Sequence, residues 1–519
     1  MKMQLVTDAL GSQRGTRVVL VIFIVLVSAT AAVVIYGMDN NAFVFFGDAA
    51  SHIVKSREYF DSQAPGLRNI ATVWLPVPHL LLIPFVAIDP LFYSGAAGAF
   101  LGIPLLALTA LIIYLIVERL TDSRFIAFTS ASVFALNPNM TYIFLTPMSE
   151  PGLMFFTALA GYSFLRWVES KKVEHLFVSS SAVALATLCR YEVWPLAPFL
   201  ASLAFFDWYW RRKGKQDAKI AKAAIAAMVA FAGIGFWLAW NYFLYGSALE
   251  FAHKTYTAGS AIARATLERR PQNIFLYLGQ AIFIIYGPFV ILLALFALFR
   301  LTRLPNIRRR VAIILFFSIP PISTTVAIAL GFVQVDQWTW NWRYVLSFGL
   351  FFAICVGIGL SLLFSVIRSN IVRSLIVASL AVMPLVQLLS PSVGVETFSE
   401  AEKIFNYGPR DGAFLGAKLR DAYNGGTIAL VTGYGQGQRI MLTAHIPLKQ
   451  FRTIPEKRSD DFPGSAANAD NYIVIGKDPF PESHLLVDYW LQRRALLLQY
   501  YSVRSEDDHY ILLERKVHG

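Results

Sequence analysis

Long apolar runs, separated by short polar segments, make up the chain as far as about residue 390. Because about 20 apolar residues are enough for a helix to cross a bilayer, this pattern predicts an α-helical polytopic membrane protein with about 11 transmembrane helices. The first run is longer than the apolar region of a signal peptide, so it is expected to remain as a helix. The spans are predicted at residues 18–36, 93–117, 125–136, 152–167, 176–189, 194–206, 224–242, 274–299, 311–331, 345–366 and 374–389.

Beyond these runs the pattern changes to that of a soluble α/β domain. Short apolar stretches at 427–433, 471–476 and 509–516 are typical of buried strands, and 435–444 is predicted to be a helix after a glycine turn. We therefore predict two domains. Residues 1–390 form a transmembrane domain that includes an outer loop at 37–92, and residues 391–519 form a small extracytoplasmic α/β domain.

The composition supports a membrane protein, because 56% of the residues are hydrophobic and only 15% are charged, against about 25% in soluble chains. The net charge of +12 would suit nucleic acid, but the basic residues fall in short clusters between apolar runs, such as 207–223 and 300–310. Such clusters are typical of cytoplasmic loops. We therefore expect the lipid bilayer and no nucleic acid as a partner. The charge bias places the N-terminus in the cytoplasm and the C-terminal domain outside, in a multi-pass protein of the cell membrane.

One acid in the first outer loop stands in an unusual setting. Asp48 follows three phenylalanines, Phe43, Phe45 and Phe46, directly after the first predicted span. A carboxylate held between aromatics at a bilayer surface is a plausible catalytic group. His52 lies four residues later, on the same face of a helix. With no third ligand at clear spacing, we expect no metal and no other cofactor, although the pair leaves a divalent metal open.

Other polar residues gather on the side assigned as outer, and each also has a purely structural interpretation. An acid at a helix mouth favours the helix dipole, neighbouring charges pair with each other, and aromatics form interfacial belts. His79 suits a hydrogen-bonding role. Together with Asp48, however, these residues indicate a polar site over an apolar interior. The candidates for substrate binding are His52, His79, Glu150, Arg190, Tyr191, Glu192, Arg343 and Tyr344.

This layout resembles the GT-C superfamily of membrane glycosyltransferases. The resemblance rests on the acid in GDAASH (47–52), the WLPVPH return (74–79), SEP (149–151) at a helix mouth and RY at 190–191 and 343–344. The nearest branch is similar to the protein mannosyltransferases and the aminoarabinose transferases. Many members carry paired acids in the first loop, whereas Asp48 has no adjacent acid, which argues against a metal-dependent mechanism.

The resemblance implies transfer of a hexose or pentose from a polyprenyl-phosphate-sugar donor to a hydroxyl of a glycan, lipid or protein acceptor on the outer face of the membrane. Asp48 would be the base of a single, inverting displacement. Glu150 would bind acceptor or sugar. Arg343 would hold the donor phosphate, with Arg190 as a second candidate.

A transporter or flippase of a lipid-linked or small solute is the main alternative. Transporters commonly place ionisable groups near the midplane of the membrane, in broken helices. Here the predicted spans after residue 224 hold almost no charged residue, and the acids gather at the outer ends. The distribution of charge therefore favours an enzyme.

Overall fold

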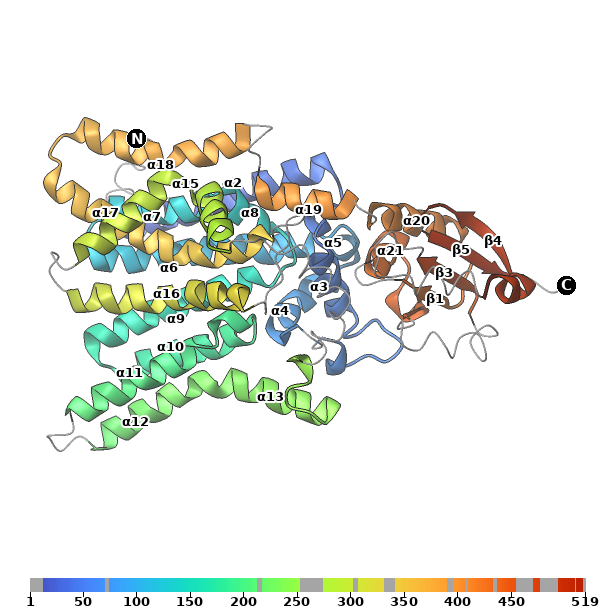
Figure 1. The fold of residues 1–519 in the computed structure, drawn as a ribbon, viewed down its shortest axis with the longest axis horizontal. Helices are drawn as coiled ribbons and strands as arrows, with labels where there is room; N and C mark the ends of the chain where they lie inside the picture. Colours follow the sequence, from blue (N-terminus) through green and yellow to red (C-terminus); the bar gives the residue numbers. More distant parts are fainter. Residues whose placement is uncertain are drawn as a thin grey trace.

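A helical bundle and a smaller unit built on a β-sheet follow one another along the long axis of the molecule (Figure 1). The computed structural model describes residues 13–70, 74–211, 217–252, 274–301, 307–330, 341–389, 395–406, 409–432, 436–453, 470–476, 493–508 and 510–516. Short helices from the first outer loop lie between the bundle and the sheet. The predicted fold class, a polytopic helical protein with a small C-terminal α/β part, is confirmed.

The helices follow the apolar runs of the sequence. As far as residue 170 they are α2 (Gln13–Met38), η1 (Ala42–Val44), α3 (Gly47–Arg57), η2 (Leu67–Asn69), α4 (Pro76–Val86), α5 (Asp89–Tyr93), α6 (Ala97–Thr121), α7 (Arg124–Ala135), α8 (Pro138–Leu145) and α9 (Glu150–Ser170). Next come α10 (Val173–Thr187), η3 (Tyr191–Val193), α11 (Leu196–Arg211), α12 (Asp217–Met228), η4 (Val229–Phe231), α13 (Ala232–Tyr245), α15 (Ile274–Arg300), α16 (Ile307–Ala329), η6 (Trp342–Phe348), α17 (Gly349–Val366) and α18 (Asn370–Leu389).

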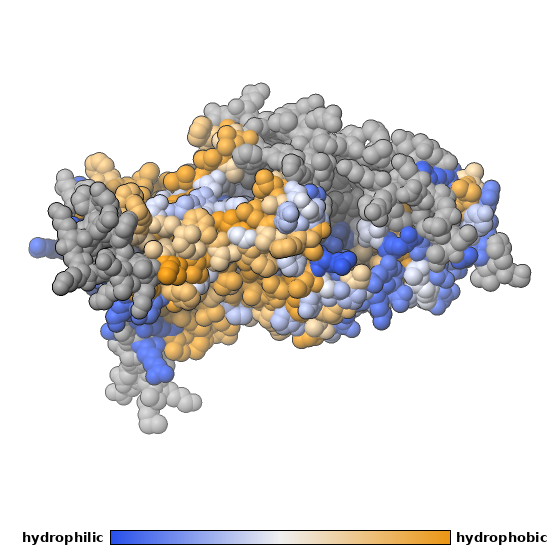
Figure 2. All heavy atoms as spheres, turned by 90° about the horizontal axis from the view of Figure 1, so that it is seen from below, coloured by the Kyte–Doolittle hydropathy of each residue, from blue (hydrophilic) through white to orange (hydrophobic). Residues whose placement is uncertain are grey.

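Several of these helices present apolar side chains outward, as a lipid-facing surface requires. Figure 2 shows a broad hydrophobic surface over the bundle and more hydrophilic residues toward the sheet. Among the described residues, seven helices are long and apolar enough to cross a membrane, or up to eight if the bent pair α8–α9 counts as one span. Shorter apolar helices such as α7 and α10 were also predicted as spans. The exact number of crossings therefore stays a prediction.

The segment at 137–151, which lies between two of the predicted spans, is itself partly helical. It contains the buried helix α8, which meets α9 at an angle of 111°. Asn137 caps α8, because its side-chain oxygen accepts hydrogen bonds from the backbone N–H groups of Asn139 and Met140. Pro138 suits the first turn, where a backbone N–H is not needed. The bend brings the start of α9 into the bundle end nearest the sheet.

Four segments predicted to face the cytoplasm meet at the opposite end of the bundle. Glu169, in the last turn of α9, accepts from Arg119 of α6 and from Arg309 of α16, both at 2.9 Å. Arg17 of α2 pairs with Glu118 at 2.8 Å. These charged residues therefore share one end of the bundle, and the loop at 37–92 lies at the other.

The C-terminal unit consists of α19 (Glu396–Asn406), α20 (Pro409–Ala422), α21 (Gln436–Ala444), η7 (Leu448–Gln450) and the strands β1 (Ile428–Val431), β2 (Phe451–Thr453), β3 (Tyr472–Gly476), β4 (Tyr501–Glu506) and β5 (Tyr510–Arg515). The strand order is β2-β1-β3-β5-β4. β1 pairs in parallel with β2 and β3, and β5 runs antiparallel to β3 and β4. The fully apolar runs in β1 and β3 fit central strands buried on both faces.

The first outer loop shares a hydrophobic core with this unit. Buried residues of α3 and α4, including Ile53 and Leu82, belong to the same cluster as Leu419 of α20 and Ile440 of α21. α4 and nearly all of α5 lie within the segment at 37–92 that was predicted as an outer loop. The sheet therefore supports the loop that carries Asp48.

Candidate active site

Asp48 lies in the first turn of α3, where the helix dipole favours a negative charge. The residue before the helix, Phe46, is extended (φ −64°, ψ 133°), so the chain turns sharply just ahead of Asp48. Phe43, Phe45 and Phe46 are all buried, at 2–3% exposure. The aromatic residues thus anchor the chain in protein, and the Asp48 side chain, 24% exposed, is left at the edge of the packed core.

Arg343 is the direct partner of Asp48. Its Nη2 donates to Asp48 Oδ2 at 2.6 Å, although the two residues are 295 positions apart in the chain. Arg343 lies in η6, directly after Asn341, which adopts a left-handed conformation (φ +49°), and Trp342. The Arg343 Nε is buried and has no hydrogen-bond partner within the described part of the chain. The guanidinium group therefore retains a donor for a further ligand.

Arg190 forms a second cluster with two acids. Its Nη1 donates to Glu150 Oε1 at 2.8 Å and its Nε to Glu192 Oε1 at 2.6 Å. The side chains of Glu150 and Glu192 are only 3% and 12% exposed. Ser149 lies 3.3 Å from both Arg190 and Glu150. The bend between α8 and α9 and the turn before η3 bring these residues together.

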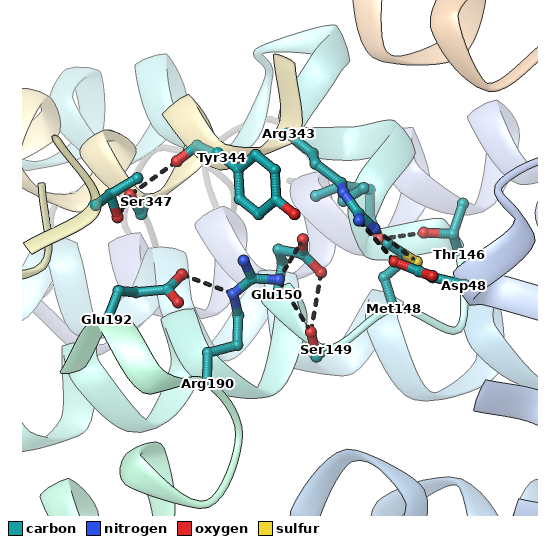
Figure 3. Close-up of polar contacts among 12 residues, drawn as sticks. Asp48, Thr146, Met148, Ser149, Glu150, Arg190, Glu192, Arg343, Tyr344 and Ser347 are labelled. Atoms are coloured by element: carbon teal, nitrogen blue, oxygen red, sulfur yellow. Dashed lines mark hydrogen bonds and ion pairs between the residues drawn. The ribbon is translucent and has the colours of Figure 1, made fainter. Parts of the chain in front are cut away.

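Tyr344 joins the two clusters. Its ring lies 5.2 Å from the Arg343 guanidinium carbon and 5.4 Å from that of Arg190. Figure 3 shows the Tyr344 ring near both arginines, with Asp48 beside Arg343, and Glu150 and Glu192 beside Arg190. These cation–π contacts help to keep both guanidinium groups in place.

The remaining candidates lie beside the site or away from it. His52 Nδ1 lies 2.7 Å from His79 Nε2, and His79 Nδ1 contacts the Ile70 carbonyl. Because a carbonyl only accepts, His79 Nδ1 carries the proton and Nε2 accepts from His52. Tyr191 instead stacks on Phe251 at 5.3 Å. The two histidines thus hydrogen-bond to each other, and their part in substrate binding stays a prediction. No group of three metal-ligating side chains occurs within the described residues.

The surroundings lower the pKa of the acid and of both histidines, for different physical reasons. Burial by itself raises the pKa of Asp48. The charge of Arg343 and its hydrogen bond, together with the nearby His52 and Arg190, outweigh burial and hold the pKa below its ordinary value. Burial lowers the pKa of His52 to about 4 and that of His79 well below its ordinary value. At neutral pH the site therefore holds an ionised Asp48 beside two neutral imidazoles.

Two contacts of the site were missed from the sequence. Ser149 directly precedes Glu150, so the sequence indicated that it lies near that acid. Its contact with Arg190 depends on the bend at the start of α9. Met148 places its sulfur 4.0 Å from Arg343 Nη1. A methionine in an apolar stretch carries no signal for such a contact.

The chain was compared with protein families and with solved structures. A family model described as dolichyl-phosphate-mannose-protein mannosyltransferase matches residues 91–240, from the end of α5 into α13. ArnT from Cupriavidus metallidurans bound to undecaprenyl phosphate is similar over 95% of this chain and 98% of its own, with a TM-score of 0.55 at 14% identity. This chain has the GT-C fold. The resemblance seen in the sequence is thereby confirmed.

The chain is also similar to a second solved structure. The similarity to the Archaeoglobus fulgidus oligosaccharyltransferase tethered with an acceptor peptide spans 93% of this chain and 72% of that enzyme's chain, with a TM-score of 0.49 at 12% identity. No curated protein matches the sequence. The matched family region contains Glu150 and Arg190 but neither Asp48 nor Arg343, so the roles of the latter two are argued from their geometry.

Proposed function

We propose that the protein is a glycosyltransferase that moves a sugar from a polyprenyl-phosphate-linked donor to an acceptor hydroxyl by a single inverting displacement. The observation that carries the proposal is the Asp48–Arg343 pair, with a spare guanidinium donor, at one end of a lipid-exposed bundle. A polar site at that place reaches the phosphosugar while the lipid tail stays beside the helices. The GT-C fold and the family match support this class of reaction.

In the proposed step Asp48 accepts the proton of the acceptor hydroxyl while that oxygen attacks the anomeric carbon. The bond from the anomeric carbon to the phosphate oxygen breaks, and its electron pair leaves with the polyprenyl phosphate. Arg343 stabilises the charge on the phosphate, a task for which a planar guanidinium is suited. The configuration at the anomeric carbon inverts.

Donor binding also activates the base. In the free protein Arg343 lowers the basicity of Asp48. When a phosphate shares the guanidinium, part of that positive charge is compensated, and the pKa of Asp48 rises. Arg343 thus keeps Asp48 ionised until the donor arrives, and the donor then makes it a stronger base.

The second cluster is proposed to bind the sugar or the acceptor. Glu150 and Glu192 offer carboxylate oxygens to hydroxyl groups, and Arg190 holds both acids in place. We place this site and residues 391–519 on the extracytoplasmic side. The cluster of Arg119 and Arg309 at the opposite end fits a cytoplasmic face.

Replacing Asp48 with Asn tests the mechanism. Reconstituted protein receives a labelled polyprenyl-phosphate sugar, and transfer to cell-envelope acceptors is measured. Asp48→Asn should lower the rate about 10²- to 10⁴-fold, the usual contribution of a general base. Asp39→Asn, in the same loop, is the matched control, because an amide oxygen can still accept from the Asn41 backbone. Transfer by Asp48→Asn at the wild-type rate, or solute uptake without transfer, contradicts the proposal.

A further inference from the structure

The backbone on both sides of the Asp48–Arg343 pair is held by the C-terminal unit. The two residues come from α3 and η6, and α19 and α21 contact the chain beside each of them. Neither α19 nor α21 contributes a side chain to the two arginine clusters described above. Their contacts therefore bear on how the site is positioned.

Glu400 of α19 holds the segment that leads into Arg343. It is buried, at 4% exposure, and its carboxylate accepts from the backbone N–H groups of Asn341 at 2.5 Å and of Trp342 at 3.1 Å. Asn341 adopts the left-handed conformation that non-glycine residues rarely occupy. Two charge-assisted hydrogen bonds at this turn fix the direction in which Arg343 leaves it.

Arg439 of α21 holds the segment that leads into Asp48. Its Nη2 donates to the Phe46 carbonyl at 3.2 Å, and its guanidinium carbon lies 5.0 Å from the ring of Phe405, in α19. Phe405 in turn stacks on Phe45 at 4.7 Å. The ring of Phe46 lies 5.6 Å from the guanidinium carbon of Arg343, so this segment contacts both members of the pair.

Arg439 is a costly residue for structure alone. It is 1% exposed, its Nε and Nη1 have no hydrogen-bond partner, and no acid lies within ion-pair distance in the described part of the chain. Burial lowers its pKa to about 9. An unpaired buried cation destabilises a fold, and an apolar side chain of similar size would serve packing better. Its one bond to the chain beside Asp48 is the contact that distinguishes it from such a side chain.

We infer that Glu400 and Arg439 are positioning residues that set the approach of Arg343 and Asp48, so that the C-terminal unit forms part of the catalytic assembly. The inference rests on the proposed function for its kinetic consequences. It gives the C-terminal unit a role besides any contact with an acceptor.

Matched substitutions in the full-length, reconstituted protein test the inference. Glu400→Gln removes the charge and leaves one acceptor oxygen for two N–H groups, and Glu402→Gln, at an exposed position of α19, is its control. Arg439→Met removes the bond to Phe46, and Arg504→Met, on the edge strand β4, is its control. We expect kcat to fall about 10- to 100-fold in the first member of each pair, as for a displaced catalytic group, and to stay unchanged in the controls.

Two further measurements separate positioning from folding. Arg439→Met should leave the thermal midpoint unchanged or raised while kcat falls, and Arg439→Lys, which keeps a donor for Phe46, should restore part of kcat. A looser pair also weakens the effect of Arg343 on Asp48, so the acid limb of kcat/KM should move to higher pH. Loss of kcat only in proportion to lost folded protein, with an unmoved acid limb, overturns the inference.

A structure of Glu400→Gln makes the test independent of the proposed reaction. If the wild-type protein transfers no sugar, the proposed function fails, but the Asp48–Arg343 distance still decides the inference. A separation clearly longer than the 2.6 Å of the wild type supports positioning by Glu400. An unchanged separation overturns it, whatever the activity of the wild type.

Discussion

Arg343 and Arg190 both contact the ring of Tyr344, but their guanidinium groups are used differently. Arg190 pairs with two buried acids through Nε and Nη1. Arg343 pairs with one partly exposed acid, and its Nε has no partner within the described residues. A fully engaged ion cluster fixes geometry, whereas an incompletely engaged one can take a ligand. The difference favours Arg343 over Arg190 as the proposed ligand of the donor phosphate.

The largest effect on donor binding should come from changing the two arginines to lysine. Arg343→Lys keeps the charge but loses the planar fork and the Nε donor, so we expect the KM for the donor to rise about tenfold or more. Arg190→Lys should change the KM for the donor less and lower the thermal stability more. Steady-state kinetics over a range of donor concentrations, together with thermal unfolding in detergent, measure both. Equal effects of the two changes on the donor KM would remove the distinction between the clusters.

Of the two acids, Glu150 should matter more for stability and Asp48 more for the rate. Glu150→Gln removes one of the two negative charges that pair with the buried Arg190. The free energy of unfolding should therefore fall by about 1–3 kcal/mol. Asp48→Asn, at a side chain with 24% exposure, should destabilise the protein less while lowering the rate more. Unfolding curves of the two variants in one detergent give the comparison. A larger loss of stability for Asp48→Asn would show that its pair with Arg343 is mainly structural.

The smallest effect should be that of pH. Because Arg343 holds the pKa of Asp48 below its ordinary value, Asp48 stays ionised as the pH falls from 8 to 5. His52, with a pKa lowered to about 4, stays neutral over the same range. We expect kcat/KM for the wild type to stay level between pH 8 and pH 5 and to fall only at lower pH, as Asp48 takes up a proton. A midpoint between pH 6 and pH 7 would instead point to a histidine that titrates during the reaction.

Local patterns predicted most of the elements. Apolar runs of helical length placed the long helices, and the apolar stretches in β1, β3 and β5 placed three strands, because each pattern is set by neighbouring residues. The helix at 137–151 escaped prediction, since Asn and Pro at its start are typical of loops and of helix caps alike.

The sequence by itself determined that this chain is a multi-pass helical protein with a small α/β unit, and that Asp48 stands out among its acids. Hydrophobic length and the setting of one residue are local properties. Only the tertiary structure decided that Arg343 contacts Asp48 and that Arg190 pairs with Glu150 as well as Glu192. It also decided that the Tyr191 ring stacks on Phe251 and not on the arginine clusters. Partners up to 295 residues away are selected by the packing of helices and by the bend between α8 and α9, and no local pattern records that packing.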